Sequence, residues 1–96
     1  MTTPDERVYN GARAREVLEN TEFIAAFDAI EKEVIDTWTS SPARDAEGRE
    51  RLWTYLHLLR KVRTQLMSTM ETGKLAQLDI NHRRSTAEKL RSMLSL

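Results

Sequence analysis

Cysteine is absent from these 96 residues, which excludes disulfide bonds and zinc sites built on thiolates. Helix breakers are scarce, with three glycines and two prolines, and β-branched residues other than threonine are few, which argues against β-sheet. No apolar run approaches the roughly 20 residues of a membrane-spanning helix. What remains is 40% hydrophobic and 31% charged, a composition typical of a small, soluble, all-α protein with one domain at most.

The N-terminal segment, residues 1–6, holds threonine, proline and acids without an apolar core. We therefore expect no signal peptide. The default location is the cytoplasm, or a particle assembled there.

Charge is distributed unevenly although the net charge is zero. Residues 1–50 hold twelve acids and six bases, and residues 51–96 hold three acids and nine bases. Two interpretations are open. An acidic helix could lie beside a basic one within the fold, or the molecule could be dipolar and offer its basic end to an acidic partner.

An amphipathic helix is expected from about Glu22 to Thr39, because apolar residues recur there at spacings of four, three and four. These residues are Phe23, Phe27, Ile30 and Val34. Asn20 or Thr21 can cap its start, and Pro42 disfavours helix beyond its end.

A longer amphipathic helix is expected from about Asp45 to Thr72, with Asp45 or Ser41 as its cap. Its apolar seam repeats at helical spacing and comprises Leu52, Leu56, Leu59, Leu66 and Met70. Gly73 is expected to end this helix as a C′ residue in left-handed geometry.

Weaker helices are expected at the two ends of the chain. One runs from Asp5 or Asn10 to Glu19, and its Val17 and Leu18 could cover the end of the longer helix. The other begins at Ser85-Thr86-Ala87-Glu88, which matches the capping box, after a connector that follows Gly73. The chain is thus interpreted as a helical hairpin domain with an N-terminal helix, residues 1–76, and a connector with a C-terminal helical tail, residues 77–96.

The two central helices are joined by about five residues and should pack antiparallel. The expected contacts are Val34–Leu52, Ile30–Leu56 and Phe27–Leu59. Arg63 falls next in this register. It could stack on Phe23 and reach Glu22 or Glu19, or it could contact an acidic partner.

Apolar residues flank the main seam of the longer helix in excess of what one antiparallel neighbour can cover. Surplus apolar surface of this kind marks an interface, unless the first helix and the tail cover it. The expected interface residues are Trp53, Leu58, Met67, Arg60, Lys61, Arg83 and Arg84.

Catalytic and metal-binding patterns are weak. Asp79 and His82 form one carboxylate–imidazole pair, whereas a di-metal bundle needs two Glu-x-x-His motifs, and His57 is expected to be solvated. Glu31 lies near Phe27 and could have a buried partner. No Ser/His/Asp set and no phosphate-binding glycine loop occurs. We expect no catalytic residues, no metal and no cofactor, and hence no enzyme activity.

Nucleic acid is the alternative partner. Basic residues gather on the longer helix and on the tail, and they could bind phosphates. These residues are Arg60, Lys61, Arg63, His82, Arg83, Arg84, Lys89 and Arg91. Helix-turn-helix spacing is missing, and a pI near 6.7 is low for a DNA-binding domain.

Three segments carry a family resemblance: Ala14-Arg15-Glu16-Val17-Leu18-Glu19-Asn20, Arg49-Glu50-Arg51-Leu52-Trp53 and Glu71-Thr72-Gly73-Lys74-Leu75-Ala76. With them, residues 12–76 resemble small uncharacterised helical proteins of bacteriophages and prophages. The resemblance implies a phage structural or virion-assembly protein, located in the virion or the host cytoplasm. Its expected partners are a second copy of itself and other phage particle proteins, without membrane contact.

Overall fold

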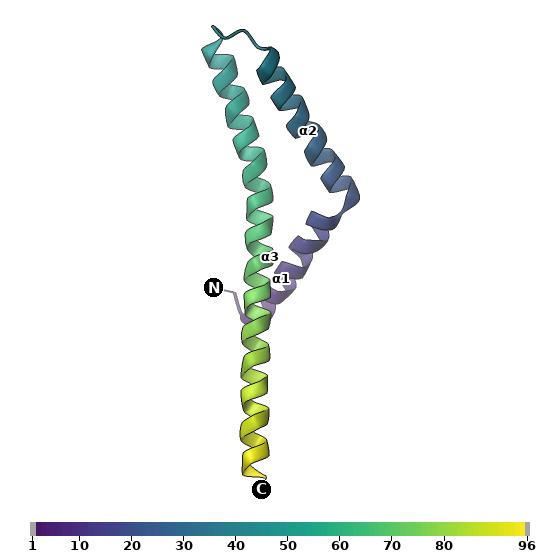
Figure 1. The fold of residues 1–96 in the computed structure, drawn as a ribbon, viewed down its shortest axis with the longest axis vertical. Helices are drawn as coiled ribbons and strands as arrows, with labels where there is room; N and C mark the ends of the chain where they lie inside the picture. Colours follow the sequence, from purple (N-terminus) through teal and green to yellow (C-terminus); the bar gives the residue numbers. More distant parts are fainter. Residues whose placement is uncertain (1, 96) are drawn as a thin grey trace.

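Three helices make up the computed structural model, which describes residues 2–95: α1 (Pro4–Glu19), α2 (Thr21–Ser40) and α3 (Ala46–Leu94). No strand occurs among those residues, so the expected all-α hairpin with an N-terminal helix is confirmed. The 49 residues of α3 span about 73 Å at 1.5 Å per residue, and the molecule measures 79 × 25 × 18 Å. α1 and α2 lie along one part of α3, and the rest of α3 extends past them (Figure 1).

Side-chain caps set the ends of α1 and α2. The Thr3 hydroxyl accepts a hydrogen bond of 3.1 Å from the backbone N–H of Glu6, and Pro4 occupies the first turn, where its missing N–H costs nothing. Asn20 alone separates the two helices, and its side chain accepts a 2.9 Å bond from the N–H of Phe23. The expected cap at Asn20 is confirmed, and α1 begins earlier than expected because of Thr3.

α3 starts where the sequence predicted. Asp45 is its N-cap, and the Asp45 carboxylate accepts a 3.1 Å hydrogen bond from the N–H of Gly48. Its other end was predicted wrongly. The chain stays helical through Gly73, through the expected connector and through Ser85, so α3 has no break before Leu94. The division between residues 76 and 77 therefore falls inside one helix.

Gly73 does not end α3 because its role is packing. No glycine among the described residues has a positive φ. A Cβ atom built on Gly73 would lie 2.8 Å from the carbonyl oxygen of Arg7 and 2.8 Å from the Cα atom of Gly11. The backbones of α1 and α3 touch at this crossing, and two glycines permit the approach.

The buried core is thin. Only Ala14, Phe27 and Ala76 are buried hydrophobic side chains among residues 2–95. α1 packs on α3 largely through small residues, and Val17, which was expected to cover α3, stays 38% exposed.

α2 and α3 run antiparallel, as predicted. Arg49 lies over the ring of Trp38, whereas Arg63, farther along α3, lies over Phe27, earlier in α2. Val34 and Leu52 line one groove between the helices. The contacts Ile30–Leu56 and Phe27–Leu59 stay predictions.

Arg63 takes a different partner from the one expected. Its guanidinium lies 5.5 Å from the ring centre of Phe27, one turn from Phe23. Glu19 pairs with Arg15 instead, and no ion pair of Arg63 with Glu19 or Glu22 occurs in the described part of the chain. Stacking of Arg63 on a phenylalanine of α2 was foreseen, and the guanidinium reaches the ring one turn from Phe23 because a long side chain leans along its helix. Phe23 and Arg63 still line the same small pocket.

Candidate interaction surface

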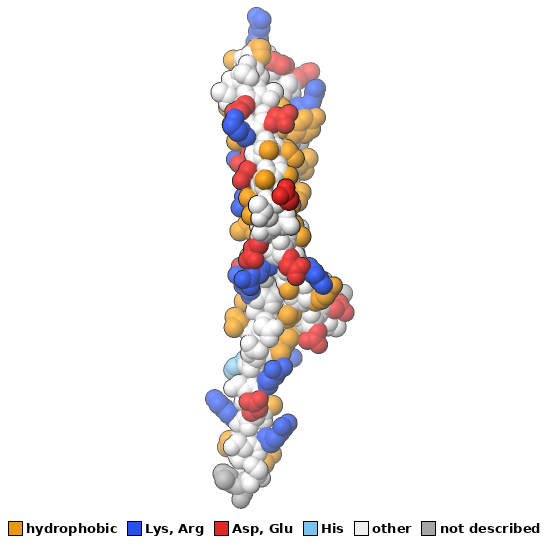
Figure 2. Space-filling view, turned by 90° about the vertical axis from the view of Figure 1, so that its right-hand side faces the viewer, with side chains coloured by type: hydrophobic (Ala, Val, Ile, Leu, Met, Phe, Trp, Pro, Cys, Tyr) orange, Lys and Arg blue, Asp and Glu red, His pale blue; other side chains and the backbone are white. Residues whose placement is uncertain are grey.

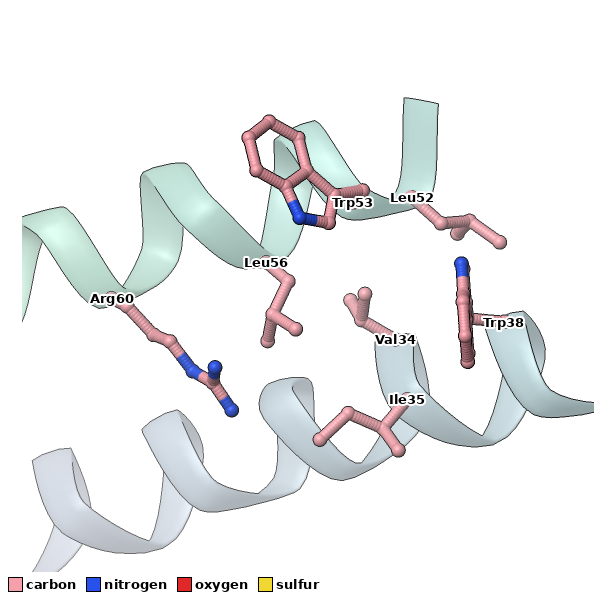
Figure 3. A pocket seen from close by; sticks show the side chains of 7 residues that line it. All are labelled: Val34, Ile35, Trp38, Leu52, Trp53, Leu56 and Arg60. Carbon is pink, nitrogen blue, oxygen red and sulfur yellow. The ribbon is translucent and has the colours of Figure 1, made fainter. Parts of the chain in front are cut away.

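An apolar groove of about 310 Å³ lies between α2 and α3 near their connection. Its lining consists of Val34, Ile35, Trp38, Leu52, Trp53, Leu56 and Arg60. Figure 3 shows Val34 of α2 and Leu56 of α3 directed toward each other, while the Trp53 ring points away from α2. The groove is therefore bounded by aliphatic side chains and flanked by an indole that protein atoms cover only in part.

Arg49 lies over Trp38, one of the residues that line the groove. Its guanidinium lies 4.2 Å from the ring centre of Trp38 and donates hydrogen bonds of 3.2 Å to the carbonyl oxygens of Trp38 and Ser41. It also donates a 3.0 Å bond to the Ser41 hydroxyl. A cation at the C-terminal end of α2 satisfies carbonyls that the helix leaves free, so Arg49 ties the start of α3 to the end of α2.

Arg60 and Glu31 bridge the two helices farther along the groove. Their side chains form an ion pair of 3.3 Å, and the Glu31 side chain is only 28% exposed. The partner sought for Glu31 is thus Arg60, which is itself 56% exposed, and the pair links α2 to α3 beside the groove.

Trp53 is 58% exposed and stacks on His57, with ring centres 5.1 Å apart and planes 8° apart. His57 is exposed, as was expected, and in addition covers part of one face of the Trp53 ring. Aromatic surface of this kind is enriched at protein interfaces.

Of the expected interface residues, the structure brings together Trp53 and Arg60, which both line the groove. Leu58 is 53% exposed and Met67 48% exposed, and both lie outside the groove lining. The basic members Lys61, Arg83 and Arg84 are exposed on α3, and Arg83 pairs with Asp79 at 3.2 Å. The assignment of these seven residues to an interface stays a prediction.

Sequence reasoning missed the α2 side of this surface. Ile35 and Trp38 were not among the expected interface residues, yet they are 38% and 41% exposed and line the groove. It also missed Leu75 and Leu78, which are 66% and 64% exposed on α3. Their sequence signal was an apolar pair at helical spacing, and it was hidden by their assignment to a connector.

The charge of the surface changes along the molecule. α2 carries five acids and one base, and that base, Lys32, bonds to Asp36, which raises the pKa of Lys32. Basic side chains prevail on the part of α3 that extends beyond α1, as the lowest part of Figure 2, below the bulge, shows. An excess of acids on α2 and an excess of bases on the last turns of α3 thus lie in different parts of the molecule.

No group of three or more His, Asp or Glu side chains able to hold a metal ion occurs within residues 2–95. Within the same range, no helix is long and apolar enough to cross a membrane.

Comparison with known proteins found no matching family model, no similar curated protein and no similar solved structure. Exposed apolar side chains along an extended molecule indicate binding partners on physical grounds.

Proposed function

We propose that this chain is a non-enzymatic structural or assembly protein that acts through helix-mediated protein contacts and self-association. The observation that supports the proposal is the balance of apolar side chains within residues 2–95: three are buried, and sixteen large ones are exposed. Monomeric soluble proteins rarely leave large contiguous apolar patches uncovered. A protein of this shape can bury more apolar surface against other chains than it buries in its own core.

The sequence resemblance to phage proteins indicates the biological context of this proposal. The partners would then be a second copy and other particle proteins, in the virion or in the host cytoplasm. A long helix with exposed faces suits such assembly because it presents contact sites far apart.

Sedimentation of the wild type and of a Trp53→Ala, Leu58→Ala variant tests the proposal. Both side chains are more than half exposed, so the variant should fold and should associate at least tenfold more weakly. High salt should weaken only the electrostatic part of association. The proposal would be contradicted by a wild-type protein that stays monomeric at high concentration and does not bind phage particle proteins.

A second candidate is a nucleic-acid-binding accessory protein, in packaging or regulation. It is favoured by the exposed Arg84, Lys89 and Arg91 on the extending part of α3. Binding to duplex DNA whose affinity falls steeply with salt would support this candidate, and salt-independent or absent binding would reject it.

A further inference from the structure

The last turns of α3, residues 81–95, are exposed at every position, so no other described part of the same chain covers them. Their apolar side chains Leu90, Met93 and Leu94 are 54%, 69% and 86% exposed. They recur at i, i+3 and i+4, which is the spacing of anchors that an amphipathic helix places in a groove. We call residues 81–95 the tail.

We propose that the tail of one copy occupies the α2–α3 groove of a second copy, and the reverse, in a two-fold dimer with antiparallel α3 helices. This inference rests on the proposed self-association and names its site. The groove supplies an apolar floor from Val34, Leu52 and Leu56, and the tail supplies three apolar anchors.

The tail cannot reach the groove of its own chain. Leu56 and Met93 belong to one uninterrupted helix, and 37 residues at 1.5 Å separate them by about 56 Å. Only another molecule can bring them together.

Charge favours the same pairing. α2 as a whole carries five acids against one base, whereas the charged residue that lines the groove itself, Arg60, is paired with Glu31. The tail carries four bases against one acid, Glu88. Complementary charge of this kind orients partners and suppresses the opposite arrangement, in which two tails or two α2 helices would meet.

The proposed contact is compatible with a two-fold symmetry axis. If Met93 of one copy lies beside Leu52 or Leu56 of the other, the two-fold axis passes midway, near residues 73–75. Leu75 is exposed at this level and stands on the side of α3 opposite Gly73, because two residues advance the helix by about 200°. α1 packs at Gly73 and leaves Leu75 66% exposed, with Arg7 of α1 at the edge of the same side. Leu75 would meet its symmetry mate, as an isologous interface requires, and Met93 lies on the same side of α3 as Leu75 because 18 residues make five full turns.

Cross-linking can test the contact because the chain has no cysteine of its own. Two single variants, Ile35→Cys at the groove and Met93→Cys on the tail, are mixed and oxidised. We expect a disulfide-linked dimer of the two variants. The matched control replaces Met93→Cys with Ser92→Cys, which lies on the other side of the tail from Leu90 and Leu94, and its yield should be at least tenfold lower.

A second measurement is the dimer dissociation constant from sedimentation. Leu90→Glu with Met93→Glu should raise it at least tenfold, while Asn81→Glu with Ser92→Glu, which adds the same charge away from the side of Leu90 and Met93, should change it less than threefold. All four positions are exposed, and circular dichroism checks that α3 stays helical.

The outcomes separate this inference from the proposed function. Suppose that the protein is an oligomer, that the Ile35→Cys and Met93→Cys variants form no disulfide with each other, and that the Leu90→Glu, Met93→Glu variant keeps the wild-type dissociation constant. That result overturns the groove contact and leaves self-association standing. A protein that stays strictly monomeric overturns both the groove contact and self-association. If that monomer also binds DNA through its tail, the result supports the nucleic-acid candidate.

Discussion

The crossing of α1 and α3 at two glycines makes Gly73→Ala an informative substitution. In an open helical site, alanine in place of glycine stabilises by about 0.8–1.0 kcal/mol. At Gly73 the new methyl group would lie 2.8 Å from the Arg7 carbonyl oxygen and 2.8 Å from the Gly11 Cα atom. Both are backbone atoms, so the clash is relieved only if α1 moves.

Overpacking of this kind costs about 1–3 kcal/mol, which exceeds the gain in helix propensity over most of that range. Gly73→Ala should therefore lower the free energy of unfolding, by up to about 2 kcal/mol, and Gly73→Leu should lower it more. Urea unfolding followed by circular dichroism measures this change.

Ser85→Ala is the matched control, because Ser85 is an exposed interior position of the same helix. It should be neutral or stabilising by a few tenths of a kcal/mol. Hydrogen exchange adds a local readout, since amides of α1 should exchange faster in Gly73→Ala. If Gly73→Ala stabilises the protein by about 1 kcal/mol, as in an open helical site, and leaves exchange in α1 unchanged, the close crossing is refuted.

Two further predictions concern the hairpin. Phe27→Ala should lower the free energy of unfolding by about 3–5 kcal/mol because Phe27 is buried. Leu56→Ala, at a half-buried site, should lower it by about 2 kcal/mol. Thermal melts near wild type for both variants would mean that these faces are not the core. Arg49→Ala should cost about 1–2 kcal/mol by removing hydrogen bonds to Trp38 and Ser41. Arg49→Lys should recover little of that loss because an ammonium group cannot reproduce the planar stacking, and urea unfolding of the two variants checks both statements.

The helix starts could be predicted because their signals are local. Asn20 and Asp45 cap the residues that follow them within one turn, so their role is visible in a few letters of sequence. The same holds for the helical spacing that placed α2 against α3.

The role of Gly73 could not be predicted from its neighbours in the sequence. A glycine serves equally as a C′ residue and as a point of backbone contact, and the choice depends on Gly11, which is 62 positions away in the sequence. Once Gly73 is helical, Ser85 has no free N-terminal turn to cap, and the capping-box pattern loses its meaning. One long-range contact thus accounts for both the wrong helix end and the false connector.

The candidate site was predictable only in part for a similar reason. Spacing identified Trp53 as a flanking residue, but the depth of the groove depends on how far α2 stands from α3. That separation is a property of the packed pair, in which Arg60 contacts Glu31 and Arg49 contacts Trp38, and not of either helix alone.

The single-residue joint at Asn20 has a mechanical consequence. α1, α2 and the first part of α3 form a closed triangle (Figure 1), with corners at Asn20, at the Ser41–Asp45 turn and at the Gly11–Gly73 contact. A triangle of stiff rods cannot change shape unless a side bends or a corner opens. We therefore expect the three helices within this triangle to resist bending. Loss of one of the three corner contacts should make all three sides more mobile at once.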